Sequence, residues 1–189
     1  EMSSRPSSSV WAMGRNNYGQ LGLGAADNDA HTTAEQLPAL GSGVVQVAAG
    51  SRFSAALSAG GEVYLWGSNE YGAPGGGVTD PTRVSALGTD TVQLALGAHH
   101  ALALKLGGAV FSWGNGGQGQ LGLGDTDNRN TPTEVAGLGT DNAYIAAQHY
   151  GGMALKSDGR LFNWGSNSGN ELGQTCTDTC YGESCCLSP

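Results

Sequence analysis

Three histidines near the middle of the chain are the first side chains to test for chemistry, because imidazole acts both as a general base and as a metal ligand. They are His99, His100 and His149. His99 and His100 fall in an apolar run of strand composition, where neighbouring side chains point to opposite faces, so the two cannot chelate one ion together. No Ser-His-Asp or Cys-His set stands in a strand-turn-helix context. We therefore predict no catalytic residues, and the protein is not expected to be an enzyme.

Two short acidic segments offer clustered oxygen atoms of the kind that bind calcium. Asp27 and Asp29 form one, and Asp125 and Asp127 form the other. Neither segment has the Gly at the sixth position or the Glu at the twelfth that an EF-hand loop requires. Asp and Asn are also frequent turn formers. The pattern favours turns in surface loops, and no metal site is predicted.

A glycine-rich string at 117–122, Gly-Gln-Gly-Gln-Leu-Gly, fits the dinucleotide-binding fingerprint, and Asp141 lies near the expected distance from it. That fingerprint works at the N-terminus of a helix, where backbone N–H groups bind the pyrophosphate. Nothing helical follows this string. A structural repeat already accounts for its glycines, so no cofactor is predicted.

All four cysteines of the chain fall within eleven residues, at Cys176, Cys180, Cys185 and Cys186. Four thiols allow three pairings, and the sequence does not choose among them. A disulfide knot formed in an oxidising compartment is the favoured interpretation. A four-thiolate zinc site fits poorly because it would need two Cys-x-x-Cys pairs, and free thiols are the remaining alternative. The disulfide interpretation slightly favours an extracellular or surface location over a cytoplasmic or nuclear one.

The composition of the 189-residue chain points to many tight turns rather than long helices. Glycine accounts for 33 residues, and only 13% of the residues are charged. The formal net charge of −8 opposes a nucleic-acid partner, because phosphate binding needs clustered Lys and Arg. No apolar run reaches the roughly 20 residues that cross a bilayer. We divide the chain into a flexible segment 1–9, a repeat domain 10–175 and a cysteine-rich tail 176–189.

One unit is written several times along the chain. Its anchor is a large apolar residue followed by glycine, and successive anchors are 53, 47 and 51 residues apart. Within each repeat two segments have fixed lengths of 16 and 13 residues, and all the variation lies in one loop. A packed supersecondary unit with one tolerant surface loop has this pattern. The four anchors are Met13-Gly14, Trp66-Gly67, Trp113-Gly114 and Trp164-Gly165.

The segments of fixed length predict β-strands. A glycine-containing pair follows the second strand of each repeat, and such pairs accept positive φ at both centres of a two-residue hairpin. A third strand ends at each anchor, and a short edge-like strand precedes the first. The first strands are 44–49, 91–96 and 142–147; the second are 53–58, 100–105 and 151–156; the edge-like strands are 34–37, 81–84 and 132–135; and the hairpin pairs are Gly60-Gly61, Gly107-Gly108 and Asp158-Gly159.

Four short strands occur in each of three repeats, with one additional strand at 10–14. This count predicts an all-β fold of β-propeller blades, each blade being a sheet of four antiparallel strands. A β-sandwich would not explain the fixed lengths.

These motifs together resemble the regulator of chromosome condensation repeat. They are a Trp-Gly-x-Asn-x-x-Gly-Gln-Leu-Gly turn, a Pro-x-x-Val strand, an Ala-Ala-Gly run and an Asp-Gly hairpin, spread over residues 10–173. Met13 replaces Trp, the Gln-Leu-Gly turn is lost after Gly72, and Asn170 replaces Gly while preserving the turn. The resemblance implies a ring of seven blades, of which this chain would supply three, and a hydrogen-bonded structural role for His100.

The resemblance implies three kinds of function. Guanine-nucleotide exchange on a small nuclear GTPase needs the whole ring. Sensing of ultraviolet-B light needs Trp in a motif whose counterparts here, at 50–54, 97–101 and 148–152, contain none. Scaffolding that binds a protein partner through blade loops needs only a rigid ring and variable loops, and it is the predicted function. A structural component of an extracellular or surface assembly, cross-linked through the cysteine tail, is the alternative.

We expect the partner to contact the variable loops at 14–33, 67–80 and 114–131. The acidic charge would steer a basic partner toward the protein. That partner is either a separate protein or a chain that completes the propeller, and an oligomer of this chain is one way of completing it. The predicted contact residues are Asn17, Tyr18, Asp27, Asp29, Glu70, Tyr71, Asp125, Asp127 and Arg129.

Overall fold

The computed structural model describes residues 9–68, 70, 77–170, 172–173, 178–180 and 183–186. Within these ranges nearly all regular structure is β-strand, joined by three short 3-10 helices. The first seven strands are β1 (Trp11–Arg15), β2 (Ala30–Gln36), β3 (Val44–Ala49), β4 (Phe53–Ser58), β5 (Val63–Gly67), β6 (Val78–Arg83) and β7 (Thr91–Leu96). The remaining strands are β8 (His100–Lys105), β9 (Val110–Gly114), β10 (Arg129–Glu134), β11 (Asn142–Gln148), β12 (Gly151–Lys156), β13 (Leu161–Ser166), β14 (Asp178–Cys180) and β15 (Glu183–Cys186).

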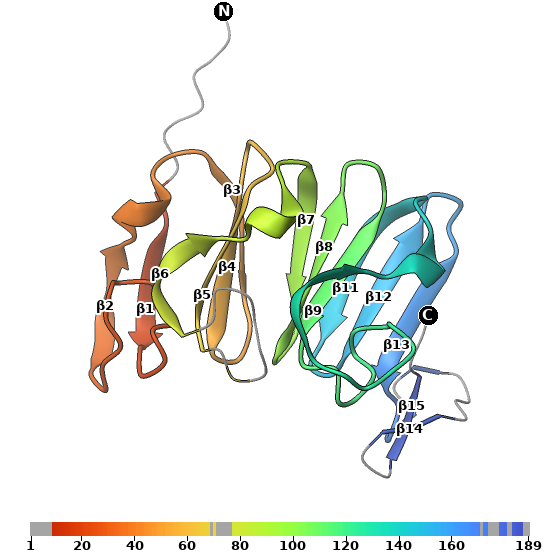
Figure 1. Ribbon diagram of the computed structural model, residues 1–189. Helices are drawn as coiled ribbons and strands as arrows, with labels where there is room; N and C mark the ends of the chain where they lie inside the picture. The colour runs from red at the N-terminus through yellow and green to blue at the C-terminus, as the bar shows by residue number, and fades with distance from the viewer. Residues whose placement is uncertain are drawn as a thin grey trace, which may run out of the picture.

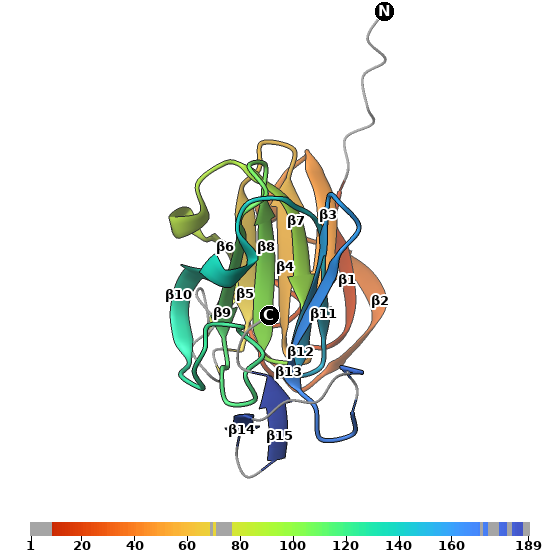
Figure 2. The ribbon, with the colours of Figure 1, turned by 90° about the vertical axis from the view of Figure 1, so that its right-hand side faces the viewer.

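The strands form antiparallel sheets that stand side by side, with β1 and β2 at one end of the row and β11 to β13 at the other (Figure 1). The sheet orders are β1-β2, β3-β4-β5-β6, β7-β8-β9-β10 and β11-β12-β13-β15-β14. Strands β3, β7 and β11 are neighbours across the sheets, on the side away from β6 and β10 (Figure 2). The two middle sheets confirm the prediction of four antiparallel strands.

The sheets group the strands differently from the sequence repeat. Each edge-like strand pairs with the strand before it, so β2 pairs with β1, β6 with β5 and β10 with β9. The first sheet therefore has two strands, where the sequence predicted a single additional strand at 10–14. In the last sheet β13 pairs with β15 of the tail, with Gly165 opposite Cys186.

The hairpins between the second and third strands are longer than predicted. Ser58 N–H bonds to the Glu62 carbonyl at 2.9 Å, and Gly61 N–H bonds back to the Ser58 carbonyl at 3.0 Å. Only the second residue of the pair has a positive φ, at +76° for Gly61, +82° for Gly108 and +91° for Gly159. This is a three-residue loop, a turn followed by one left-handed residue. The expectation of positive φ at both centres was wrong.

Apolar clusters fill the spaces between neighbouring sheets. Trp66 and Leu37 pack between the first sheet and the second. Trp113 and Leu65 belong to the cluster between the second and the third, and Trp164 lies with Val110 and Ile145 between the third and the fourth. The repeated tryptophans are thus buried packing residues, as the sequence predicted. Met13, at the corresponding position of β1, is 66% exposed.

Two glutamine side chains fasten the inner strands of neighbouring sheets. Gln46 on β3 donates to the Leu94 carbonyl on β7 at 2.7 Å and accepts from Leu94 N–H at 2.9 Å. Gln93 on β7 makes the same pair of bonds to Ile145 on β11, at 2.9 and 3.0 Å. A side-chain amide carries the same donor and acceptor as a peptide group, so each glutamine acts as a short piece of strand between two sheets.

The 3-10 helices Pro38–Leu40, Ser85–Leu87 and Ala136–Leu138 carry the chain from the outer strand of one sheet to the inner strand of the next. In the last two sheets a lysine holds this connection. The Lys156 ammonium group bonds to the Leu138 carbonyl and to Asp141, and Lys105 bonds in the same way to Leu87 and Asp90.

Candidate functional site

Where they are described, the loops between β1 and β2, β5 and β6, and β9 and β10 lie at the same end of the sheets (Figure 1). The turns that join β3 to β4, β7 to β8 and β11 to β12 lie at this end as well. We call this end the loop face. It carries the described parts of the three predicted partner loops, so the predicted contact residues that are described lie on one side of the molecule. Tyr71 lies outside the described residues.

Side-chain hydrogen bonds hold the loop of one sheet against the next sheet. The Trp66 indole N–H donates to the Gln20 carbonyl at 2.9 Å, and Trp164 donates to the Gln120 carbonyl at 2.9 Å. Asn16 shapes the first loop from inside, because its Oδ1 accepts Leu21 N–H at 3.1 Å while its Nδ2 donates to the Ala25 carbonyl at 2.7 Å. Side-chain hydrogen bonds therefore hold the first loop, between β1 and β2, and the third loop, between β9 and β10.

Arg52 connects two predicted contact residues from different sheets. It lies in the turn between β3 and β4, with its guanidinium 4.6 Å from the centre of the Tyr18 ring in the first loop. The same guanidinium forms an ion pair with Glu70, in the loop that follows β5. The cation–π contact and the ion pair make Tyr18, Arg52 and Glu70 one continuous polar surface. The sequence analysis missed Arg52, because its partners come from loops far apart in the sequence.

The histidines of the loop face have different environments. His100 is fully buried at the start of β8, with Nε2 3.1 Å from the Gly151 carbonyl. Burial lowers the pKa of His100 to about 4, so the ring is neutral. This confirms the structural role that the family resemblance implied. Burial also lowers the pKa of His99. His149 contacts the Tyr150 ring edge to face, with ring centres 4.3 Å apart.

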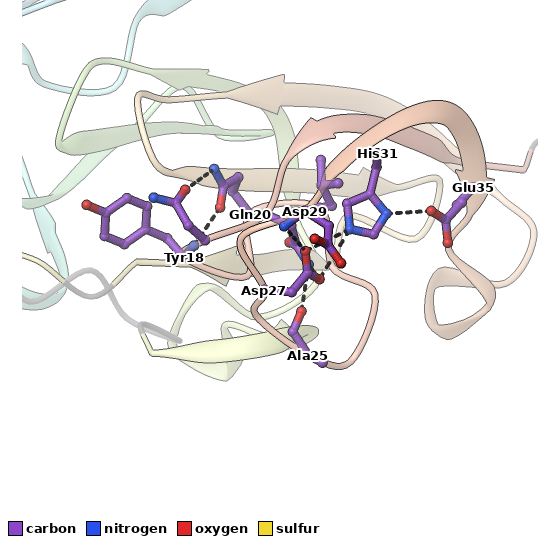
Figure 3. Close-up of polar contacts among 10 residues, drawn as sticks. Tyr18, Gln20, Ala25, Asp27, Asp29, His31 and Glu35 are labelled. Carbon is purple, nitrogen blue, oxygen red and sulfur yellow. Dashed lines mark hydrogen bonds and ion pairs between the residues drawn. The ribbon is translucent and has the colours of Figure 1, made fainter.

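A polar cluster surrounds His31, the second residue of β2 (Figure 3). Its Nε2 lies 3.1 Å from Asp27 Oδ1, and its Nδ1 lies 2.5 Å from Glu35 Oε1. Asp27 also accepts the Asp29 N–H at 3.1 Å and the Asn16 amide at 3.0 Å. The predicted contact residues Asp27 and Asp29 are thus joined in a turn, and the sequence analysis missed the histidine that completes it. Asn17 accepts a weak bond from Gln20 at 3.4 Å.

The third loop carries a matching cluster. Arg129 donates to Asp125 at 2.5 Å and lies 3.9 Å from Asp127, while Asp127 N–H donates to Asp125 at 3.0 Å. The carboxylates of Asp27, Asp125 and Asp127 therefore face a cationic or imidazole group of their own loop. Within the described ranges, no three His, Cys, Asp or Glu side chains are placed to hold a metal ion.

In three of the four anchors, the adjoining turn leaves no room for a side chain at the glycine. Gly67, Gly114 and Gly165 all have positive φ, and a Cβ on any of them would lie 2.3 to 2.6 Å from a carbonyl of the adjoining turn. Those carbonyls belong to Arg52, His99 and Tyr150. Gly14 has φ of +120°, but a Cβ there would meet no described atom within 4 Å. Of the cysteines, Cys176 lies outside the described residues, and only the backbone of Cys180, Cys185 and Cys186 is described.

Antiparallel four-stranded sheets, packed face to face with their inner strands adjacent, are the construction of a β-propeller. Residues 7–57 and 107–154 match the regulator of chromosome condensation (RCC1) repeat, and 44–73 and 91–120 match a second description of the same repeat. The chain belongs to this family.

Solved propellers resemble the chain along most of its length. Prp20p from Saccharomyces cerevisiae, studied for its binding to Gsp1p and histones, is 33% identical with a TM-score of 0.79, over 96% of this chain and 45% of that one. Human WBSCR16 is 28% identical with a TM-score of 0.74, over 86% of this chain and 43% of that one. The human E3 ubiquitin-protein ligase HERC2 is 41% identical over 75 residues, which are 39% of this chain and 2% of that protein. The chain thus spans less than half of each relative.

Within the described residues, no helix is long and apolar enough to cross a membrane.

Proposed function

We propose that this chain is a non-catalytic scaffold that binds a protein partner through the loop face. The observation that supports the proposal is the bridge from Tyr18 through Arg52 to Glu70, which makes loops of two sheets into one surface. Loops held by a rigid framework are common binding elements. The net charge of −8 favours a partner with a basic surface.

The titration of two probe proteins tests this proposal. Prp20p is described as binding Gsp1p and histones, so Gsp1p and core histones are suitable probes for the 189-residue chain. Arg52→Gln breaks the bridge on the loop face without adding a carboxylate and should weaken binding by about tenfold, as loss of an interface arginine commonly does. Leu106→Ala is the matched control, because Leu106 is 78% exposed in a hairpin at the opposite end of the sheets. Equal binding by both variants, or no binding of either probe, would contradict the proposal.

Guanine-nucleotide exchange on a small nuclear GTPase, which the family resemblance implies, is the second candidate, since the chain belongs to that repeat family. The proposed scaffold should leave the release of labelled GDP from such a GTPase unchanged. Acceleration of release by the chain, and its loss in Arg52→Gln, would establish exchange instead.

We further propose that the partner, or a second partner, adds two strands to the first sheet. Strands β5, β9 and β13 each pair on one edge with the strand before them, while β1 pairs only with β2 among the described residues. In the other sheets, the anchor glycine meets the turn that joins the two inner strands. The corresponding space beside Gly14 is open. A hollow of about 580 Å³ lies there, and its lining includes Trp11, Met13 and Phe53. An inner pair of antiparallel strands fits this place.

Light scattering with and without reductant tests how the two strands are supplied. A discrete oligomer that persists in reductant would support completion by further copies of this chain. An oligomer that dissociates only on reduction would instead support the alternative, a structural assembly cross-linked through the cysteine tail. A monomer under both conditions would exclude completion by a second copy.

A further inference from the structure

His31 and Arg129 occupy the same position in two sheets. His31 lies opposite Gly14 in the first sheet, and Arg129 lies opposite Gly114 in the third. Each follows an acidic turn of the same form, since Asp27 and Asp29 precede His31 at the spacing with which Asp125 and Asp127 precede Arg129. In both turns the first aspartate accepts the backbone N–H of the second and faces the cationic or imidazole group four residues after itself. The two loops are therefore held by equivalent side-chain contacts, which an arginine makes in one loop and a histidine in the other.

These two contacts differ in how their strength depends on pH. Arginine is charged at every pH that a protein survives. Both ring nitrogens of His31 face carboxylate oxygens, Nδ1 that of Glu35 and Nε2 that of Asp27. Only the imidazolium form donates from both nitrogens, because a neutral ring turns one lone pair toward a carboxylate. The geometry at His31 is therefore that of the protonated ring.

We propose that His31 is a proton-controlled latch, which fastens the loop between β1 and β2 when the ring is protonated and releases it when the ring is neutral. The latch reaches into the loop through Asp27, which also binds Asn16 and the backbone of Asp29. Asn16 in turn holds the backbone of Leu21 and Ala25. Loss of the His31 contact thus loosens the network that shapes residues 16–29, including Tyr18 on the loop face. A role in partner binding rests on the function proposed above.

The charged groups around His31 determine whether the latch closes at low or at high pH. Hydrogen bonds to Glu35 and Asp27 raise the pKa of His31 above its ordinary value of 6.5, and the Asn16 side chain lowers the pKa of Asp27 below 3.8. The latch is therefore closed at mildly acid pH and opens as the pH rises through the raised pKa of His31. Other charged groups on the surrounding elements are Asp29 in the loop, Arg15 on β1 and Asp80 on the adjacent β6, whose carboxylate lies near Gly24.

Exchanging the two residues tests the proposal. Amide hydrogen exchange of the 189-residue chain is measured at pH 5.5 and pH 8.0, with each rate divided by the intrinsic rate at the same pH. In the wild type, protection of residues 16–29 should fall roughly threefold or more at the higher pH, while residues 115–128 keep theirs. His31→Arg should remove the pH response of the first loop. Arg129→His should transfer a response of the same sign to the third loop, which then serves as its own matched control.

A second measurement is made on the unmodified chain. The ring nitrogens of His31, followed by nitrogen-15 chemical shift, should show two bound protons up to a pH above 6.5. A His31 ring that is neutral at pH 6.5, or a His31→Arg variant that keeps the wild-type pH response, would overturn the proposal. Both measurements use the chain without a partner, so they decide the latch separately from the titration of Gsp1p and histones.

Discussion

The indole N–H of Trp164 donates to the carbonyl of Gln120, 44 residues earlier in the chain, and fastens the third loop to the fourth sheet. Trp66 does the same for the first loop, where Gln20 is the acceptor. Trp113 occupies the corresponding position between them and is equally buried, but its Nε1 has no hydrogen-bond partner within the described structure. The loop that would supply its acceptor is the one whose sequence lacks the Gln-Leu-Gly turn.

This difference predicts unequal effects of the same substitution. Trp164→Phe leaves the Gln120 carbonyl without its donor, whereas Trp113→Phe removes ring volume but no hydrogen bond that the described residues make. We expect Trp164→Phe to lower the free energy of unfolding by about 1–3 kcal/mol more than Trp113→Phe does. Urea denaturation of both variants measures the difference, and equal losses would show that the indole bond contributes nothing.

Substitution of two neighbouring glycines in one hairpin should also change the stability by unequal amounts. Gly108 has φ of +82°, and a Cβ on it would lie 2.0 Å from the Thr140 carbonyl. Gly107 has open space around its Cβ position. Gly108→Ala should therefore cost at least about 2 kcal/mol, through strain and overlap, and Gly107→Ala less than about 0.5 kcal/mol. Thermal unfolding compares the two, and similar melting temperatures would contradict the three-residue hairpin.

His100 should make the whole fold less stable in acid. Its pKa is lowered from 6.5 to about 4 by burial, so the unfolded chain binds a proton that the folded chain rejects. The contribution of the neutral His100 ring to the free energy of unfolding is fully present above pH 6.5. It is lost as the pH falls toward 4, and the loss amounts to at most about 3 kcal/mol. His100→Phe should remove this loss, because Phe53 fills the same position against Gly50 as His100 does against Gly97. Urea titrations between pH 4 and 7 test it, and an unchanged slope in the variant would refute it.

Lys156 and Arg160 both contact Asp141, but they should differ in importance. Lys156 is 5% exposed and also binds the Leu138 carbonyl, whereas the Arg160 side chain is 62% exposed. Lys156→Met should cost about 1–3 kcal/mol, because a buried acceptor loses its donor. Arg160→Met should cost much less, because water screens an exposed ion pair. The hydrogen bond from Lys156 lowers the pKa of Asp141, so Lys156→Met should also raise that pKa, which carbon-13 shifts of the carboxyl group would show.

The positions of most strands could be predicted from the sequence, because two segments of every repeat have the same length. The predicted ranges 44–49, 53–58, 91–96 and 100–105 match β3, β4, β7 and β8. The grouping into sheets did not follow, because a local pattern shows where a strand lies but not which neighbour it pairs with. The two-residue hairpin was wrong for a related reason, since a Gly-Gly pair fits both loop lengths.

The candidate site was predictable only in part. Loop positions follow from variable length, and these loops do share one face. The Arg52 bridge depends on the approach of separate sheets, which a single repeat does not reveal. The likeness of His31 to Arg129 was visible in the sequence, but only by counting backward from Leu37 and Val135, because the first loop is two residues longer.

The glutamine contacts between inner strands have a consequence for how such proteins diverge. Gln46 and Gln93 fasten successive sheets, and Tyr144, which is exposed, stands at the same position of β11. The contact between the inner strands thus depends in part on one side chain, which adds to the apolar packing between the sheets and takes no part in the ladder of its own sheet. A single codon change can stiffen or loosen one such contact while every sheet keeps its structure, so the spacing between the loops of the loop face can evolve separately from the loops themselves.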